Sequence, residues 1–281
     1  MTATPSPLSP SQAEHYLECG FRWYCRHVLR IPEPVTPALA IGRAVHQVAD
    51  ALLRGKGADR QAGRACTITQ ADVEDLAQDL THDAMATVDA PDTPDPDIEA
   101  ERAQDRQDAA NQVQAMCELW WRQAAPSIDP AGIEVPVSGV IAGVPVTGIV
   151  DILDTSGRVI ELKTASKKPQ GISASHYLQV VTYAILTAPA QPPQDPDWPT
   201  PRSGPGARLD TLTKTHAPGY YSHSLTVDDD AARYAESIYP MVAEAIGDGL
   251  YLPRRSSNLC SRRHCAYWQT CEAEFGGSVR P

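Results

Sequence analysis

The spacing of apolar residues predicts mostly helix over the first 120 positions. Within AIGRAVHQVADALLRG, the side chains of Val45, Val48 and Leu52 recur at three- and four-residue intervals, which places them on one face of a helix that ends near Gly55. The same reasoning predicts helices over residues 9–29, 40–55, 68–88 and 99–121. Between the last two, DAPDTPDPD is too rich in proline and aspartate to be other than an exposed loop, at residues 89–97.

The pattern changes between Gly132 and Thr164, where β-branched and small residues alternate and AGV and TSG supply two turns. We expect three antiparallel strands here. The elements expected beyond them are a helix over 173–186, a strand over 220–225 and a helix over 228–246. Proline and glycine dominate residues 188–206, which predicts a disordered loop.

This order of elements predicts an α/β (α+β) protein with a central mixed sheet flanked by helices. The length of 281 residues allows one large domain or two small ones, and 42% hydrophobic residues are enough for a sizeable core. We interpret the chain as one domain with three parts: a helical part (1–130), a core (131–250) and a cysteine-rich segment (251–281).

The net charge of −11 comes from one segment. Between Asp72 and Asp108 there are 13 acidic residues and two basic ones, Arg102 and Arg106, and the rest of the chain holds 22 of each sign. The overall charge therefore does not exclude a polyanionic partner, because electrostatic steering depends on where the charge lies. We expect this acidic segment (72–108) to face solvent or line the outer rim.

No apolar run approaches the roughly 18 residues that cross a bilayer, and the first ten residues lack the basic start and apolar stretch of a signal peptide. We therefore expect no membrane association and a cytoplasmic location. The seven cysteines are an odd number in a long chain without an export signal. They are expected to be reduced thiols that serve as ligands rather than disulfides.

Two carboxylates and a lysine form the first candidate site. Asp151 and Glu161 are expected on neighbouring strands, where they offer two hard oxygen ligands for Mg²⁺ or Mn²⁺. Lys163 would share the face of Glu161 because strand side chains alternate. This combination suits phosphodiester hydrolysis, in which a metal activates water and the lysine positions it. The alternative is three ordinary charges at strand ends, since the pattern is short.

Three further residues are candidates with a structural alternative. His46 interrupts an apolar helical stripe, where a lone histidine is more often a core or boundary residue than a metal ligand. Gln179 and Tyr183 are spaced i, i+4 on the helix that follows ELK, so they share one face. From the spacing, Tyr183 packs in the core; the functional alternative is that the pair binds a phosphate or orients the site.

A cysteine cluster closes the chain. Its members are Cys260, Cys265 and Cys271. A fourth ligand would come from Cys19 or Cys25, whereas Cys66 and Cys117 are expected to be small buried hydrophobes. Four thiolates hold zinc or an iron–sulfur cluster, and either would join the two ends of the chain. The alternative is that the cysteines bind nothing.

Taken together, these motifs resemble the PD-(D/E)XK nuclease superfamily, in particular its RecB-like branch with a C-terminal cysteine cluster, which includes CRISPR-associated exonucleases and many phage nucleases. SPSQAEHYLECGF looks like the family's Ser-x-Ser…Cys-Pro segment, with Gly20 in place of the usual proline. The other matching motifs are IGRAVHQ for G-x-x-x-H, GIVD, ELK and QVVTY for Q-x-x-x-Y.

The resemblance implies a restriction-endonuclease-like core and a role for each matching residue. The metal ligands would be His46, Asp151, Glu161 and the Leu162 carbonyl, and the catalytic residues would be Asp151, Glu161, Lys163, Gln179 and Tyr183. It also implies a [4Fe–4S] cluster on Cys19, Cys260, Cys265 and Cys271, with Zn²⁺ as the alternative. One departure is that four residues, SRRH, separate the first two C-terminal cysteines, where many relatives have two. Glu134, on the first strand, is a weaker candidate for a position near the metals.

The implied activity is Mg²⁺- or Mn²⁺-dependent DNA hydrolysis, by an exonuclease on single-stranded or frayed ends in recombination or repair. The alternatives are a structure-selective endonuclease with the same residues and a non-catalytic DNA-binding recombination module. Recombination or helicase proteins would be its partners. Basic residues at the cysteine end would contact the DNA backbone, chiefly Arg22, Arg26, Arg262 and Arg263. The aromatic residues there would stack on bases or, more commonly, pack around the cluster: Trp23, Tyr24, Tyr267 and Trp268.

Overall fold

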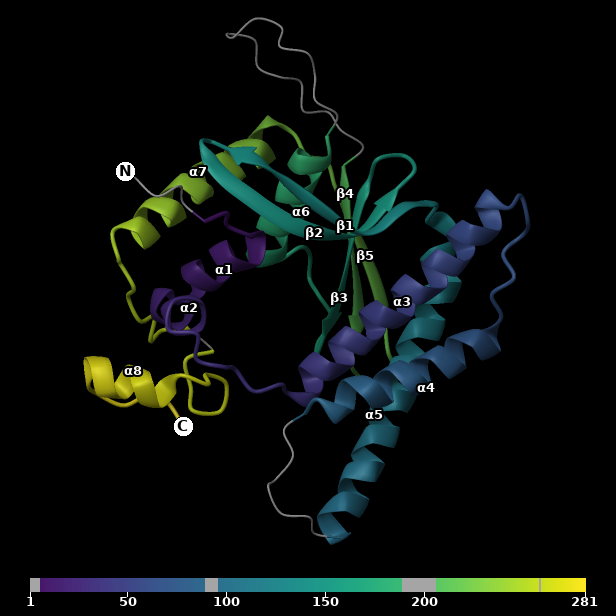
Figure 1. Ribbon diagram of the computed structural model, residues 1–281, viewed down its shortest axis with the longest axis horizontal. Helices are drawn as coiled ribbons and strands as arrows, with labels where there is room; N and C mark the ends of the chain where they lie inside the picture. Colours follow the sequence, from purple (N-terminus) through teal and green to yellow (C-terminus); the bar gives the residue numbers. More distant parts are fainter. Residues whose placement is uncertain (1–5, 89–95, 189–205, 258) are drawn as a thin grey trace, which may run out of the picture.

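A five-stranded mixed sheet forms the centre of the computed structural model, which describes residues 6–88, 96–188, 206–257 and 259–281 (Figure 1). The strands lie in chain order: β1 Pro130–Ile141, β2 Val144–Asp154, β3 Val159–Ala165, β4 Ala207–Thr213 and β5 Tyr220–Leu225. The first three pair antiparallel, as expected; β3 and β4 are parallel, and β4 and β5 antiparallel. The expected class, a mixed sheet flanked by helices, is confirmed.

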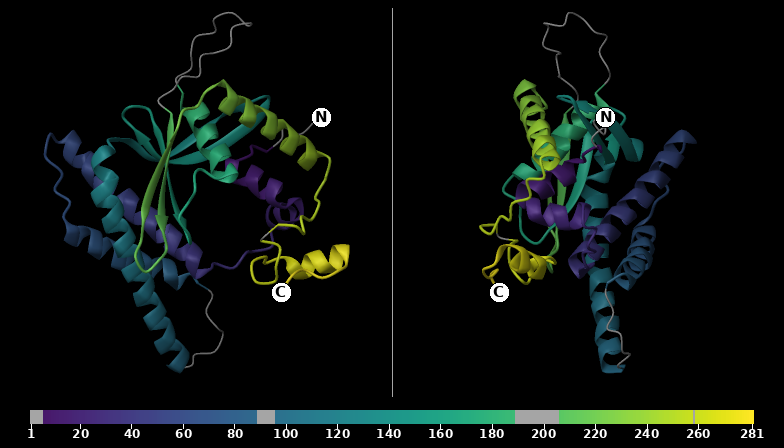
Figure 2. Two further views of the ribbon diagram at one scale, coloured as in Figure 1. Left: turned by 180° about the vertical axis from the view of Figure 1, so that it is seen from behind. Right: turned by 60° about the vertical axis from the view of Figure 1, so that its left-hand side comes forward.

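Helices cover both faces of the sheet. Their bounds are α1 Pro10–Glu18, α2 Gly20–His27, α3 Pro37–Gln61, α4 Gln70–Ala86, α5 Pro96–Gln123, α6 Ala174–Thr187, α7 Asp229–Gly247 and α8 Trp268–Phe275, with a 3₁₀ turn at Ala125–Ser127. On one face, α3 and α5 pack through Leu52 and Trp120 against Leu162 of β3. On the other, α6 and α7 pack through Leu178 and Tyr239, with α1 beside them (Figure 2).

The expected helix over 9–29 is wrong in one respect, because it is two helices. Cys19 between them is extended, with φ −164° and ψ 106°. The break brings Gly20 against the chain near the C-terminus: a Cβ on Gly20 would lie 3.2 Å from the Leu252 backbone nitrogen, and Phe21 N donates to the Leu252 carbonyl at 3.2 Å. A close backbone approach therefore ends α1 and turns Cys19 out of the helix.

Two other boundaries differ from expectation. Helix α3 does not end near Gly55 but continues to Gln61. In these extra turns, Lys56 Nζ donates to the carbonyls of Ala125 (2.6 Å) and Ile128 (2.7 Å), which stabilises them. The loop expected over 89–97 lies outside the described residues except at its end, since α5 begins at Pro96. The disordered loop expected over 188–206 lies outside them except at its two ends.

Strand β4 was not predicted, because two charges interrupt its apolar pattern. The structure buries both: Arg208 and Asp210 are 6% and 0% exposed, and their side chains form an ion pair of 2.6 Å. Trp120 Nε1 (3.2 Å) and the Tyr220 hydroxyl (2.9 Å) also donate to Asp210. A charged side chain is tolerated in a core when it is paired and hydrogen-bonded, and this strand meets that condition.

The described residues of the acidic segment (72–108) lie mostly in α4 and the first half of α5. Val73 and Ala77 bury one side of α4 against α3 and α5, and the carboxylates of the segment whose side chains are described are exposed, so this part faces solvent as expected. In the part of the chain that the structure describes, no helix has the length and apolar character needed to cross a membrane.

Candidate active site and cysteine cavity

In the hairpin of β1 and β2, the paired apolar side chains switch from one face of the sheet to the other at a single position. Ile133 and Ile152 pair across the hairpin and pack on the α3 side, whereas Val135 and Val150, the next paired residues two positions along, pack on the α6 side. Residues two apart on a regular strand share a face, so the strands are distorted between these pairs. Glu134 has a φ of +49°, which accommodates the distortion, and it lies opposite Asp151 on β2.

That residue, Asp151, occupies the point where β2 and β3 separate. Pairing of these strands stops at Ile152 and Ile160. Beyond it, Leu162 N donates to Asp151 Oδ2 at 2.9 Å, so the carboxylate replaces a ladder partner. Nδ1 of His46 lies 3.6 Å from the same oxygen. The separation of the strands thus opens a small pocket lined by His46, Glu134, Asp151 and Leu162 among others.

A glycine brings His46 to this pocket. Gly42 precedes His46 by four residues, so both lie on the same face of α3. A Cβ at Gly42 would come within 3.2 Å of Thr164 Oγ1 on β3, closer than most side-chain contacts. The G-x-x-x-H spacing therefore has a local cause: the glycine lets α3 approach β3, and the histidine one turn later reaches Asp151.

Glu161 and Lys163 complete the cluster from β3. The Glu161 side chain is 1% exposed, and its Oε1 pairs with Lys163 Nζ. Its other oxygen, Oε2, is buried and has no hydrogen-bond partner. A buried carboxylate oxygen without a partner is costly unless something binds it, and a cation is the usual solution.

Burial and mutual charge shift the pKa values of these groups in opposite directions. Burial, reinforced by the Asp151 charge, raises the pKa of Glu161 to about 7. Burial also acts against ionisation of Asp151, but contacts with His46, Lys163 and the Leu162 amide hold its pKa below its ordinary value. The pKa of His46 is raised because Asp151 outweighs the effect of burial. Negative charge thus concentrates on Asp151.

Tyr183 and Gln179 lie on the α6 side of the same cluster. Gln179 Nε2 is 3.4 Å from the Tyr183 hydroxyl, and Tyr183 is only 5% exposed, so it packs in the core as its spacing predicted. It rests on Gly148 of β2, where a Cβ would be 2.4 Å from the ring. Burial raises the pKa of Tyr183, and the charges of Glu161, Asp151 and Lys163 reach it. Core packing and proximity to the site therefore coexist.

The described residues contain no group of three His, Cys, Asp or Glu side chains already arranged to hold a metal ion. Existing contacts explain this at the sheet edge. Glu161 Oε1 is taken by Lys163, and Asp151 Oδ2 by the Leu162 amide and His46. The unpartnered Glu161 Oε2 and the remaining oxygen of Asp151 are the donors that fit a divalent cation.

Sequence reasoning missed two titratable groups beside this cluster. Burial raises the pKa of Glu14, on α1, to about 8, with Lys163 lowering it and Glu161 raising it further. Burial and the Lys163 charge lower the pKa of His176, on α6, to about 4. Glu14 Oε1 has no hydrogen-bond partner. Only the packing of α1 on α6 and β2, and of α6 on β3, brings these residues close, and no local spacing in the sequence signals it.

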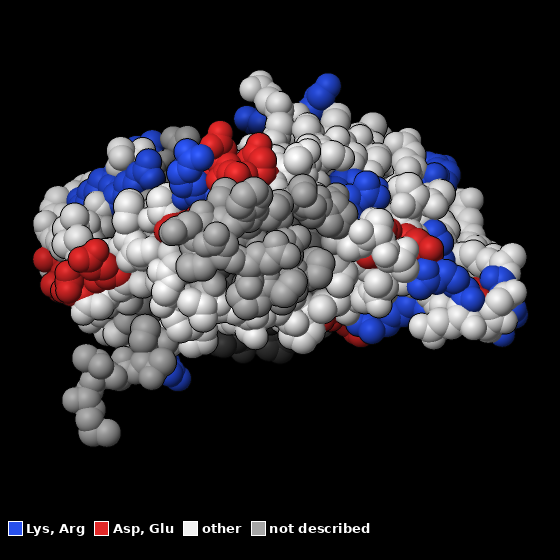
Figure 3. Space-filling model, turned by 90° about the horizontal axis from the view of Figure 1, so that it is seen from above, with Lys and Arg blue, Asp and Glu red and all other residues white. Residues whose placement is uncertain are grey.

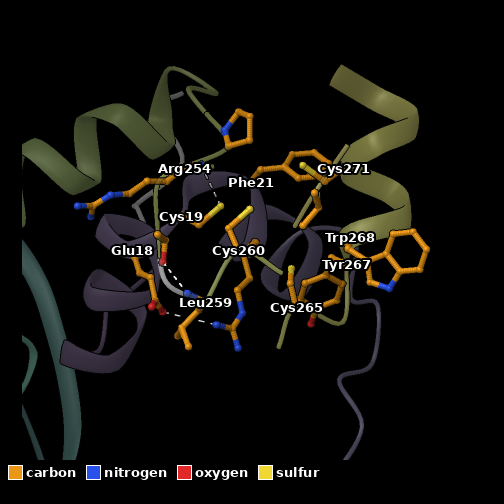
Figure 4. Close-up of a pocket in the computed structure, with 14 residues that line it drawn as sticks. Glu18, Cys19, Phe21, Arg254, Leu259, Cys260, Cys265, Tyr267, Trp268 and Cys271 are labelled. Carbon is orange, nitrogen blue, oxygen red and sulfur yellow. Dashed lines mark hydrogen bonds and ion pairs between the residues drawn. The ribbon is translucent and has the colours of Figure 1, made fainter. Parts of the chain in front are cut away.

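Four cysteines from both ends of the chain line one cavity. They are Cys19 between α1 and α2, Cys260 and Cys265 in the C-terminal segment, and Cys271 in α8 (Figure 4). Phe21 and Tyr267 are among its walls, and its space for water-sized molecules is about 30 Å³. The resemblance gave these same four residues, and the structure brings them together, although α8 itself was not predicted.

Nearby donors point at two of these sulfur atoms. The Arg254 backbone N–H lies 3.4 Å from Cys19 Sγ, and the Arg255 guanidinium 3.7 Å from Cys271 Sγ. Such donors stabilise thiolates. Burial, followed by the nearby cysteines, raises the pKa of Cys25 to about 11; this residue is 0% exposed and does not line the cavity. Cys19, and not Cys25, therefore shares the cavity with the three C-terminal cysteines.

The two remaining cysteines differ from each other. Cys117 is 1% exposed in the core between α3 and α5, as expected. The expectation for Cys66 is wrong, because it is exposed. Cys66 lies in the segment after α3. The next residue, Thr67, holds this segment against α3, because its N (2.8 Å) and Oγ1 (2.7 Å) donate to the Asp59 carboxylate.

Most arginines near the cavity make contacts within the protein. Arg22 and Arg26 both bind Glu33, at 2.6 and 2.8 Å. Arg262 binds Glu272 at 3.2 Å and lies over the Trp268 ring at 4.6 Å, whereas Arg263 is exposed.

The aromatic residues of this end mostly pack. Trp23 and Tyr267 are 6% and 1% exposed, and Tyr24 stacks on Tyr251 with ring centres 4.6 Å apart. The expectation of packing around the cysteines is confirmed for Tyr267, whereas Trp23 packs against Tyr16 and Tyr251. On the face seen in Figure 3, Lys and Arg gather in separate groups beside acidic patches, rather than in one continuous stripe.

Comparisons with known proteins agree with this architecture. A family model described as the PD-(D/E)XK nuclease superfamily matches residues 7–272. The crystal structure of a candidate exonuclease from Eubacterium rectale superposes with a TM-score of 0.51 and 12% identity, over 88% of this chain and 84% of that one, which shows a shared fold. The structure of SSO0001 is a weaker likeness, with a TM-score of 0.35 and 15% identity over 72% of this chain and 96% of that one. No curated protein matches significantly.

Proposed function

Because the chain belongs to the PD-(D/E)XK nuclease superfamily, we propose that it is a metal-dependent deoxyribonuclease whose site is formed by His46, Asp151, Glu161 and Lys163. The observation that carries this proposal is the meeting of these side chains where β2 and β3 separate, with a buried oxygen of Glu161 left without a partner. Two carboxylates, a histidine and a lysine in one pocket suit phosphodiester hydrolysis.

Each residue has a distinct task in this proposal. His46, Asp151, Glu161 and the Leu162 carbonyl would hold one or two Mg²⁺ or Mn²⁺ ions. When bound, such a cation lowers the pKa of a water molecule and neutralises charge on the phosphate. Lys163, which contacts Glu161 in the structure, orients the attacking water by donating hydrogen bonds.

The pair on α6 has a supporting task. Tyr183 and Gln179 fix the α6 side of the pocket through their mutual contact of 3.4 Å. Tyr183 also rests on Gly148 of β2, and in this proposal that contact helps to hold α6 beside the pocket.

We propose that the cysteine cavity holds a [4Fe–4S] cluster on Cys19, Cys260, Cys265 and Cys271. Convergence of four thiols from both chain ends on one cavity, with N–H donors at two sulfur atoms, supports this. Bound there, the cluster joins the chain ends and stabilises them. Zinc is the alternative. Purified protein with a broad absorption near roughly 400 nm and about four irons per chain supports the cluster, and zinc content without iron contradicts it.

For substrate, we propose single-stranded or frayed DNA ends, cut exonucleolytically during recombination or repair. The E. rectale structure that shares this fold is described as a candidate exonuclease, which supports this choice. Of the basic residues at the cysteine end, Arg263 and the part-exposed Arg26 and Arg262 are proposed as additional backbone contacts.

End-labelled single- and double-stranded DNA, incubated with Mn²⁺ or Mg²⁺, tests the activity. Wild type is expected to release labelled mononucleotides or short products, whereas Glu161→Ala and Lys163→Ala do not. Glu244→Gln, an exposed carboxylate on α7, is the matched control and retains activity. Equal cutting by wild type and both site variants would contradict the assignment. Cutting of circular single-stranded DNA would identify an endonuclease, and metal-independent binding without cutting would identify a non-catalytic module.

A further inference from the structure

A wide groove opens next to the candidate active site, on the side where β3 and β4 end. It is walled by the first half of α3 and by the ends of these two strands, and its space for water-sized molecules is about 640 Å³. His46 and Glu134 line both this groove and the smaller pocket that contains Asp151. The groove therefore leads directly to the reacting centre.

The groove has an excess of positive charge. Arg43, Lys163 and Lys214 line it, and among its described lining residues Glu134 is the one carboxylate. The parallel pairing of β3 and β4 explains the concentration, because parallel strands deliver their carboxyl ends to one edge. Lys163 is on β3 and Lys214 follows β4 directly.

One of these cations, Lys214, is held in place by hydrogen bonds. Lys214 Nζ donates to the Ala38 carbonyl in the first turn of α3 at 3.1 Å, and its backbone N donates to the Ala165 carbonyl at 2.7 Å. Burial lowers the pKa of Lys214, a cost that a neighbouring anion would offset. Arg43 precedes His46 by three residues and so lies on the same face of α3, exposed to the groove.

From these observations we infer that the groove binds the phosphate backbone of the DNA strand that is being cut, with Arg43 and Lys214 each contacting a phosphate beside the scissile one. The inference rests on the proposed function and adds the path of the substrate. Exposed lysines extend the path past the end of β3, where Lys168 Nζ lies 5.3 Å from the ring centre of Tyr221. Leu39, 46% exposed on the groove wall, offers an apolar contact for a sugar or base.

Binding of a fluorescent oligothymidylate, measured by anisotropy in EDTA over a range of NaCl concentrations, tests this inference. Chelation stops the proposed metal-dependent reaction, so binding alone is measured. Each phosphate contact to a single strand contributes about −0.7 to the slope of log K against log salt. We expect Arg43→Ala and Lys214→Met each to flatten the slope by about 0.7 and to weaken binding at low salt. Lys214→Arg, which keeps the charge, should restore the wild-type slope.

Arg122→Ala is the matched control, because Arg122 is an exposed arginine on α5 that does not line the groove; its slope should equal that of wild type. Thermal midpoints show that each variant is folded. Wild-type slopes for folded Arg43→Ala and Lys214→Met would overturn the inference even if the wild type cuts DNA. If the variants change the slope as expected but the wild type never cuts DNA, the nuclease proposal is refuted and the groove assignment stands. Absence of any wild-type binding would overturn both.

Discussion

Substitution of Gly148 by alanine tests whether the contact between β2 and Tyr183 sets the geometry of the site. An added Cβ would lie 2.4 Å from Tyr183 Cε1 and 3.1 Å from its hydroxyl oxygen. Ordinary van der Waals contact begins at 3.4 Å, so the ring or the strand must move by about 1 Å. Tyr183 is 5% exposed and packed against Val150 and Val180, which leaves little room for that movement.

The cost follows from the size of this displacement. Overpacking a filled core by one methyl group costs about 1–3 kcal/mol. For a chain of this size, each kcal/mol lowers the thermal midpoint by about 2–4 °C, so a decrease of about 2–12 °C is expected. A 1 Å displacement at a catalytic group can reduce turnover by about a hundredfold. DNA cutting should therefore fall more than the loss of stability explains at a temperature where the variant is folded.

Thermal unfolding and digestion of end-labelled DNA are the two assays. Gly247→Ala is the control, because its Cβ would meet nothing within 4 Å and alanine favours the helix; it should retain or raise the midpoint and leave cutting unchanged. Tyr183→Ala removes the ring that the new Cβ would meet, so Gly148→Ala should cost less stability in the Tyr183→Ala background than in the wild type; the double variant should remain inactive. A Gly148→Ala variant as stable and active as wild type would refute the idea that this contact positions Tyr183.

Three further predictions concern charges and thiols. The pKa of Glu14 is about 8 in the folded protein against an ordinary 4.5, so the folded state binds more protons than the unfolded state between these pH values and stability should fall as the pH rises. Relative to Glu14→Gln, the wild-type thermal midpoint should therefore decrease from pH 5 to 8. Parallel curves for the two proteins would contradict this. Asp210→Ala leaves Arg208 buried without its partner and should lower the free energy of unfolding by about 3–5 kcal/mol. The double variant Arg208→Met/Asp210→Leu should recover most of this loss. Denaturant unfolding measures both, and a loss for Asp210→Ala below about 1 kcal/mol would be too small for a buried unpaired charge. Iron analysis should show that Cys19→Ser loses the cluster and Cys25→Ala keeps it, because only Cys19 lines the cavity; the reverse result would make Cys25 the ligand.

The sequence predicts what depends on local patterns. The β1–β2–β3 arrangement followed from alternation and two turns, and α6 from its apolar spacing. Asp151, Glu161 and Lys163 could be placed together because short turns join their strands.

What the sequence did not reveal depends on contacts between distant segments. Strand β4 was hidden because Arg208 and Asp210 look like surface charges until Trp120 and Tyr220 are seen to surround them. The break at Cys19 depends on the approach of Gly20 to Leu252, more than two hundred residues away. Glu14 and Lys214 likewise gain their surroundings only when α1 packs on α6 and β2, and β4 pairs with β3. Their neighbours in the chain contain no signal of it.

The cysteine cavity also has a consequence for the order in which the molecule is completed. One of its thiols belongs to residue 19 and the others to residues 260–271, so synthesis of the intervening sheet precedes the cavity. Until the segment after the sheet is made, α2 lacks Tyr251, Leu252 and Tyr267, against which it packs. A product truncated before residue 260 would keep Tyr251 and Leu252 but lack Tyr267 and three of the four thiols, so Phe21 and Cys25 of α2 would lose part of their cover. The cavity is therefore completed only after the sheet that lies between its two halves in the chain.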